Sequence, residues 1–167
     1  IAALPMQAFA SSSNKYITSI SLKVEVELEA GDDISSGDSL GTDKSDSGSK
    51  VYTTSDKYSV VSAEWSNNKD LSIGDTPKIT VWLEANSSSN YDYDYKFRSS
   101  YSSSNISVSG GEYVSSSRSG GDLKVVIKAK GVKGTYDAPE YAEWGSGKGK
   151  ATWEAGDDCS GYYDVIL

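Results

Sequence analysis

Tyrosines recur at every second position in one short segment, where their rings could bind a sugar. Tyr91, Tyr93 and Tyr95 alternate there with Asp92 and Asp94. In an extended chain, the phenol rings lie on one face and the carboxylates on the other. Such rings stack on the C–H faces of sugars, while carboxylates accept hydrogen bonds from sugar hydroxyls. The alternative is that the ring face is simply core, and the alternation itself favours burial.

Trp82 is a second aromatic candidate for contact with a ligand or a domain. It lies in the alternating segment 79–85, on the face opposite the aliphatic residues Ile79, Val81 and Leu83. If those aliphatic side chains are buried, the indole is partly exposed. An exposed tryptophan on a sheet face is suited to a glycan or a neighbouring domain. The competing interpretation is that Trp82 packs under a linker or a second unit, because large apolar side chains usually find cover.

The composition argues against catalysis, because the chain contains no histidine. That absence removes the commonest general base, the usual partner of a serine or cysteine nucleophile, and the commonest ligand of transition metals. Carboxylate pairs for glycoside hydrolysis can be drawn from Glu140 and Glu154, or from Asp92 and Asp94. Such a pair must flank a cleft at a defined separation, and small β-sandwiches rarely supply one. We therefore predict no enzyme, no catalytic residues and no cofactor.

An acidic segment raises the question of calcium. Five aspartates crowd the stretch 31–50, namely Asp32, Asp33, Asp38, Asp43 and Asp46. Calcium takes carboxylate and carbonyl oxygens, but the spacing of these residues does not match an EF-hand loop. Because irregular acidic segments are usually just solvated, we predict no metal site here.

The single cysteine, Cys159, cannot form a disulfide within the chain. A covalent crosslink between a lysine and an asparagine or aspartate is a further way to staple an exported domain. It requires a lysine beside a buried acid, whereas Lys23 and Lys124 both lie on the predicted solvent-facing sides of strands. The sequence leaves this crosslink undecided.

Net charge and the first ten residues bear on where the protein works. With a net charge of −8, the chain has no overall attraction for nucleic acids or anionic membranes. No stretch of the sequence approaches the ~20 apolar residues that span a bilayer. Residues 1–10 are apolar and uncharged and end with Ala8 and Ala10, like the tail of a signal peptide with its cleavage site. We therefore predict an exported protein whose mature chain begins near Ser11.

Alternation over the rest of the chain predicts an all-β fold. Apolar and polar residues alternate along three long segments, 20–29, 79–85 and 123–130, which is typical of strands with one buried face. Turn residues separate these and several shorter segments, and no helix is indicated. We predict an antiparallel immunoglobulin-like β-sandwich over residues 11–130. The Gly-, Ser- and Asp-rich stretch 31–50 is predicted to be a mobile loop.

A linker is predicted at residues 131–138, where the apolar periodicity lapses, and a second unit at 139–167. In that unit, Pro139 precedes a first strand, Trp153 lies in a second, and Tyr163 opens the Tyr-Asp-Val run of a third. These residues resemble the first half of a fibronectin type III module, in which a buried tryptophan packs near a Tyr-x-Val strand. The resemblance implies a partial module at 139–167.

The order of the parts carries a broader resemblance. An export signal is followed by a Ser- and Gly-rich β-domain containing GDTPKITVWLEA and YDYDYKF, and then by APEYAEW and GKATWEA. This order resembles the N-terminal region of secreted surface proteins from clostridia-type Gram-positive bacteria, in which such modules often precede cell-wall-binding repeats. The resemblance implies a secreted, cell-wall-associated protein without enzymatic activity.

Two functions are compatible with these observations. We expect a structural spacer or adhesion module, whose partners are cell-wall or host glycans or other surface proteins. The alternative is a carbohydrate-binding module that uses the exposed aromatic candidates Trp82, Tyr91, Tyr93 and Tyr95. The sequence leaves the specific ligand and the oligomeric state open.

Overall fold

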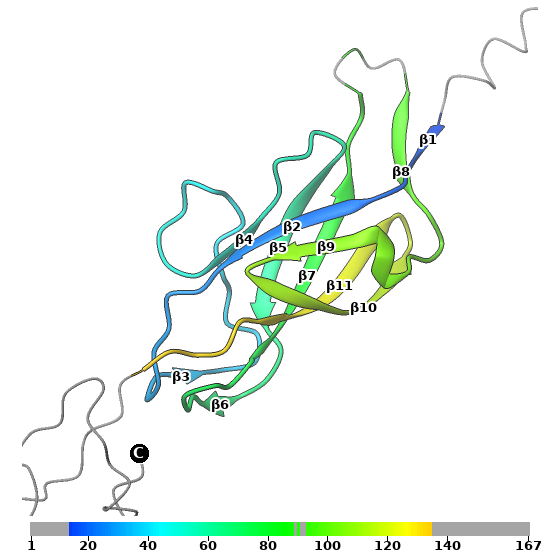
Figure 1. Cartoon of the computed structure of the whole chain (residues 1–167). Helices are drawn as coiled ribbons and strands as arrows, with labels where there is room; N and C mark the ends of the chain where they lie inside the picture. The colour runs from blue at the N-terminus through cyan, green and yellow to red at the C-terminus, as the bar shows by residue number, and fades with distance from the viewer. Residues whose placement is uncertain (1–13, 89, 91–92, 135–167) are drawn as a thin grey trace, which may run out of the picture. The chain divides into compact units, whose positions relative to one another are not determined.

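The computed structural model describes residues 14–88, 90 and 93–134 (Figure 1). The chain divides into two compact units, residues 1–134 and residues 135–167. All of the described residues therefore belong to the first unit. The predicted signal-peptide remnant and the fibronectin type III-like segment lie outside the described residues.

The described residues form strands and one short 3-10 turn. The strands are β1 (Asn14–Ile17), β2 (Ile20–Glu25), β3 (Asp33–Ile34), β4 (Lys50–Tyr52), β5 (Tyr58–Trp65), β6 (Lys69–Asp70), β7 (Lys78–Ala85), β8 (Asp94–Phe97), β9 (Ile106–Ser109), β10 (Gly111–Ser119) and β11 (Asp122–Ala129). The 3-10 turn η1 spans Ser103–Asn105. The all-β class that the alternation predicts is confirmed.

Two sheets pack together as a sandwich. One has antiparallel strands in the order β10-β11-β7-β5, and the other has the order β4-β2-β9. Figure 1 shows β2 passing across β5 and β7. Every second side chain of β7 and β11 is buried because each strand turns one face toward the opposite sheet. The shared core includes Ile79, Val81, Leu83, Leu123, Val125 and Ile127 from one sheet and Ile20, Leu22 and Val24 from the other.

Two pairs of strands run parallel, whereas the sequence predicts an antiparallel sandwich. β2 pairs with β9 in parallel, with Ile20 opposite Ile106, and β1 pairs with β8 in parallel. β2 also ends at Glu25, short of the predicted strand end at residue 29, because its pairing with β4 stops at that residue. Alternation specifies which face of a strand is buried but not the direction or length of its neighbour. The immunoglobulin-like strand arrangement stays a prediction.

The stretch 31–50 is built into the sandwich. It contains β3, which pairs with β6, and it buries Ile34 and Leu40 in the core. The backbone N–H of Leu40 donates to the carbonyl of Ala63 at 2.8 Å, which joins the stretch to the edge of β5. The composition predicts a mobile loop because apolar residues are few; the structure instead shows that two well-placed ones anchor the stretch to the core.

The first domain also extends beyond the predicted boundary at residue 130. Val132 is buried, and its backbone N–H donates to the carbonyl of Asp75 at 2.8 Å. Ala30 donates its backbone N–H to the carbonyl of Lys133 at 3.0 Å. The predicted linker 131–138 therefore begins with residues that belong to the domain. Composition hides this because backbone groups make most of these contacts.

Candidate functional site

The four-stranded sheet presents one face to the core and a second face, here termed the outer face, away from it. The strand register arranges the side chains of the outer face in rows that cross β10, β11, β7 and β5. Three rows are complete, Glu112–Lys128–Lys78–Ser66, Ser115–Val126–Thr80–Glu64 and Ser117–Lys124–Trp82–Ser62. The pairs Ser119–Asp122 and Glu84–Ser59 close one end. Every one of these side chains is exposed or half-buried.

Trp82 lies near the middle of the outer face and is half-buried. Its cross-strand neighbours are Lys124 on β11 and Ser62 on β5. The residues on either side of it along β7, Val81 and Leu83, are completely buried. The sequence placed the indole on the face opposite the aliphatic residues, and the structure agrees on this position. Its contact with a ligand or another domain stays a prediction.

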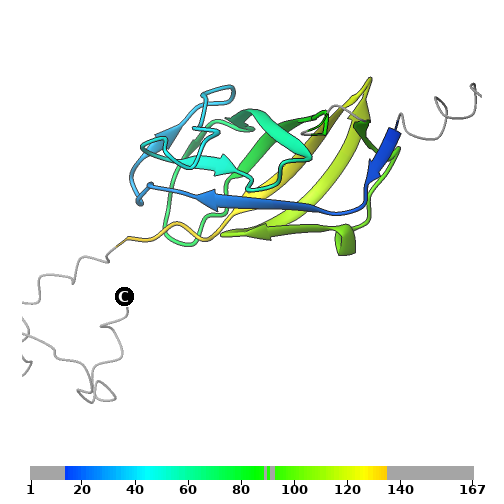
Figure 2. The ribbon, with the colours of Figure 1, turned by 90° about the horizontal axis from the view of Figure 1, so that it is seen from above.

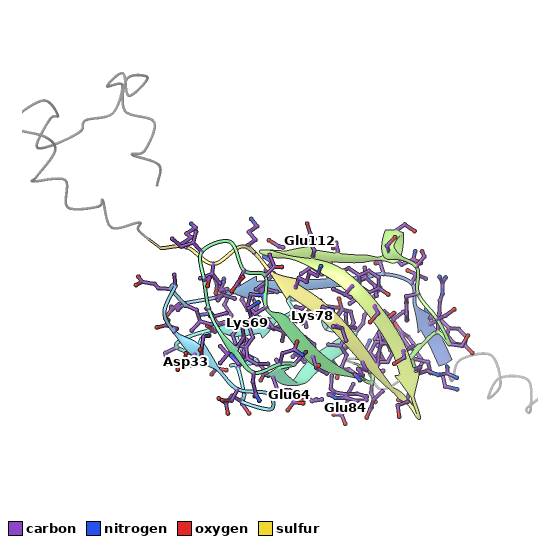
Figure 3. All side chains as sticks on the ribbon, turned by 90° about the horizontal axis from the view of Figure 1, so that it is seen from below. Asp33, Glu64, Lys69, Lys78, Glu84 and Glu112 are labelled. Atoms are coloured by element: carbon purple, nitrogen blue, oxygen red, sulfur yellow. The ribbon has the colours of Figure 1, made fainter. Side chains whose placement is uncertain are left out.

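Charges of both signs are spread over the outer face. Its basic residues are Lys78, Lys124 and Lys128, and its acidic residues are Glu64, Glu84, Glu112 and Asp122; Figure 3 shows Lys78 and three of the glutamates distributed over the sheet. The ion pairs found among the described residues, Lys50–Glu25 and Lys69–Asp75, both lie elsewhere. The charged groups of the outer face therefore remain accessible to hydrogen-bonding partners.

The alternating aromatic residues Tyr91, Tyr93, Tyr95 and Phe97 are here termed the tyrosine stripe, and its described members differ in how deeply they are buried. Phe97 is fully buried, whereas Tyr95 and Tyr93 are half-buried, and only Tyr95 of these two packs against the core. The two tyrosine rings meet edge to face, with centroids 5.3 Å apart and an interplanar angle of 88°. Tyr91 lies outside the described residues. The prediction that these rings are core is thus confirmed for Phe97, whereas Tyr93 is only half-buried.

Two lysines border the tyrosine rings. The ammonium group of Lys15 lies 4.4 Å from the centroid of Tyr93, and that of Lys57 lies 5.8 Å from the centroid of Tyr95. Cations in these positions are attracted by the ring quadrupole. The carboxylate of Asp94 accepts a hydrogen bond from the Ser87 hydroxyl at 2.8 Å. Because an ammonium group occupies a face of Tyr93, this pair is a poorer sugar platform than Trp82.

The two phenol groups are coupled. Their oxygen atoms lie 3.3 Å apart, within hydrogen-bonding distance. This hydrogen bond, together with burial and the nearby charges of Tyr93 and Asp56, raises the pKa of Tyr95 to about 12. The Tyr95 hydroxyl is therefore protonated throughout the physiological pH range.

The aspartates of the stretch 31–50 organise turns. One carboxylate oxygen of Asp46 accepts the backbone N–H groups of Thr42 and Asp43, at 2.9 and 3.0 Å. The carboxylate of Asp32 accepts the backbone N–H of Glu29 at 2.9 Å. Side chains that hydrogen-bond to nearby backbone in this way stabilise turns. Across the described part of the chain, no group of three acidic or cysteine side chains is arranged to hold a metal ion.

An acidic pair that sequence reasoning missed lies on the small β3–β6 ribbon. Asp33 and Asp70 are register partners, and a hydrogen bond between their carboxyl groups raises the pKa of Asp33. The charge of Asp70, burial and the charge of Asp32 act in the same direction. No local pattern could have revealed the pair, because its members are far apart in sequence and each strand has two residues.

Three surface hollows among the described residues have volumes of about 350, 320 and 210 Å³. The first is lined by a single carboxylate, that of Asp75, beside Lys69 and Lys78, and the second by Asp43 beside Lys44. Neither hollow presents the two carboxyl groups that glycoside hydrolysis requires. Of the carboxylates considered for that chemistry, Asp92, Glu140 and Glu154 lie outside the described residues.

The lysines considered for a crosslink differ in exposure. Lys23 is exposed, and Lys124 is half-buried between Ser117 and Trp82 on the outer face. Neither forms an ion pair with a described carboxylate within 4.0 Å. Neither therefore has the neighbouring acid that the reaction requires among the residues described.

Comparisons with protein-family models, with curated proteins and with solved structures gave no match. Among the described residues there is also no helix long and apolar enough to pass through a bilayer.

Proposed function

We propose that this chain is a non-catalytic part of a secreted, cell-wall-associated bacterial surface protein, and that its first domain is a structural spacer. One observation carries the proposal: the described chain enters the domain at β1, and the segment that follows β11 leaves it at the opposite end (Figure 2). The termini of domains often lie close together. A domain with its ends far apart instead adds its own length to a row of modules.

Both ends of the domain are held by backbone pairing, which a spacer needs. β1 is paired with β8 over four residues, from Asn14 opposite Asp94 to Ile17 opposite Phe97. At the other end, Lys133 forms a bridge with Glu29. Ile17 and Val132 are both buried in the core. A displacement of either end is thus resisted by the domain and not absorbed by loose chain.

The extracellular part of the proposal is supported by the sequence. Residues 1–10 end in the small-residue pattern of a signal-peptide cleavage site, and the chain holds one cysteine. The domain builds its core from burial alone, as an exported protein without disulfides must. The resemblance of 139–167 to a fibronectin type III module is consistent with a row of surface modules.

The spacer function is tested by changing the number of domains. An epitope tag placed just before Asn14, in the protein displayed through a C-terminal cell-wall anchor, reports how far the domain holds the tag from the cell surface. Duplicating residues 14–134 is expected to increase the access of a large antibody to the tag, and deleting them is expected to reduce it. The exposed Tyr16→Ala variant is the control and should leave access unchanged. Equal access in the duplicated, native and deleted proteins would contradict the proposal.

A further inference from the structure

Trp82 stands out on the outer face because its neighbours combine an aromatic surface with hydrogen-bonding groups. Lys124 and Ser62 flank it across the sheet, and Thr80 and Glu84 flank it along β7. It is the one aromatic residue among the described positions of the outer face. The indole is thus bordered by an ammonium group, a carboxylate and two hydroxyls.

We propose that the outer face binds an uncharged polysaccharide, with one sugar ring stacked on Trp82. The C–H face of a sugar packs on the indole, while its hydroxyls exchange hydrogen bonds with the surrounding polar groups. This adhesive function is independent of the spacer function, because it uses a face of the sheet and not the positions of the chain ends.

The charge distribution selects an uncharged ligand. Three lysines and four carboxylates share the outer face, and each of the complete rows contains at least one charged residue. Because neither sign dominates, a polyanion or a polycation would meet repulsion as well as attraction. Sugar hydroxyls both donate and accept, so a neutral glycan can bond to groups of either sign.

The outer face has room for a short stretch of polysaccharide. Seven positions of β7 span ~20 Å along the strand, and four strands span ~14 Å across the sheet.

The row that contains Trp82 ends in two small side chains. It finishes with Ser117 on the edge strand β10 and with Ser62 on β5, and both serines are exposed, although the backbone of the stretch 31–50 pairs with β5 next to Ser62, at Ala63. Small side chains at these positions leave room for a linear ligand to continue across the sheet. The tyrosine pair offers no such surface, because Lys15 lies over Tyr93 and Tyr95 packs against the core.

Affinity gel electrophoresis of the full chain tests the proposal. The probes are soluble uncharged polysaccharides, namely a β-1,4-glucan, a β-1,3-glucan, a xylan and a mannan, with heparin and polygalacturonate as charged comparators. At least one uncharged polymer should retard the native chain more than the charged polymers do. Trp82→Ala should weaken that retardation at least about tenfold in apparent dissociation constant, because truncating a central aromatic contact has effects of that size.

Three further variants keep the result interpretable. Trp82→Phe keeps an aromatic ring and should retain part of the binding, and Tyr16→Ala removes an exposed aromatic elsewhere and should retain all of it. Ser62→Arg changes an exposed position and should block the indole even if Trp82→Ala fails to fold. Circular dichroism checks that each variant is folded. No retardation by any uncharged polymer, preference for a charged one, or equal binding by native and Ser62→Arg chains would overturn the proposal.

Discussion

Asp33 and Asp70 face each other across the β3–β6 ribbon, and the hydrogen bond between their carboxyl groups raises the pKa of Asp33 above its ordinary value of 3.8. Two carboxyl groups placed together hold a proton more tightly, because ionising both creates repulsion. Since the folded pKa is raised, Asp33 stabilises the fold below its unfolded pKa. That contribution is lost as the pH rises through the folded pKa.

The acidic pair predicts a pH-dependent effect of one substitution. Asp33→Asn removes the repulsion at neutral pH and should raise the midpoint of thermal unfolding at pH 7. The gain should shrink or vanish at pH 3, where the native pair keeps its proton. Thermal unfolding followed by circular dichroism at both pH values measures this. Asp38→Asn, at an exposed aspartate without a carboxyl partner opposite, is the control. An equal gain for Asp33→Asn at the two pH values would refute the interpretation.

Tyr95 is expected to ionise late, near pH 12, because Tyr93 shares a hydrogen bond with it. The raised pKa means that the tyrosine stabilises the fold fully below about pH 10 and that this contribution is lost as the pH rises through 12. Carbon-13 NMR of the tyrosine ring carbons, with Tyr95→Phe for assignment, measures the titration. Tyr93→Phe removes the largest cause of the shift and should lower the pKa of Tyr95; an unchanged value would show that burial is the main cause.

Gly110 is expected to tolerate no side chain. It has a φ of 86°, and a Cβ atom there would collide with the backbone carbonyl of Val24. Gly110→Ala should therefore lower the free energy of unfolding by about 3 kcal/mol or more, through backbone strain and the clash. Gly31 is a matched control, since its φ of 98° is similar but nothing lies within 4 Å of its Cβ position. Gly31→Ala should cost only about 1 kcal/mol. Urea denaturation compares the two variants, and similar losses would argue against the close approach.

Leu40 tests whether the stretch 31–50 contributes to the core. The residue is 7% exposed and belongs to the core cluster. Leu40→Ala should lower the free energy of unfolding by about 2–5 kcal/mol, the range for truncating a buried leucine. Val61→Ala removes an aliphatic side chain that is 46% exposed and should change it by about 0.5 kcal/mol or less. Chemical denaturation gives both values, and a negligible effect of Leu40→Ala would restore the prediction of a loose loop.

The alternation of apolar and polar residues was enough to predict the strands that have one buried and one exposed face. The alternation in 79–85 and 123–130 predicted β7 and β11, their buried residues and the outward position of Trp82. The same alternation could not predict which strands pair when the paired residues are distant in sequence. Nothing near Ile20 indicates that it lies opposite Ile106 in a parallel pair. The tyrosine stripe shows the limit within one strand: alternation grouped the rings, but the lysines that border them come from other segments.

By itself, the sequence determined the all-β class, the faces of the principal strands and the lack of histidine for acid–base catalysis. Those features depend on residue types and on spacing along one strand. Tertiary structure alone decided that Trp82 has Lys124 and Ser62 as neighbours, that Asp33 meets Asp70, and that the stretch 31–50 joins the core. These relationships depend on strand order, direction and register, which are set by the packing of distant segments into one core.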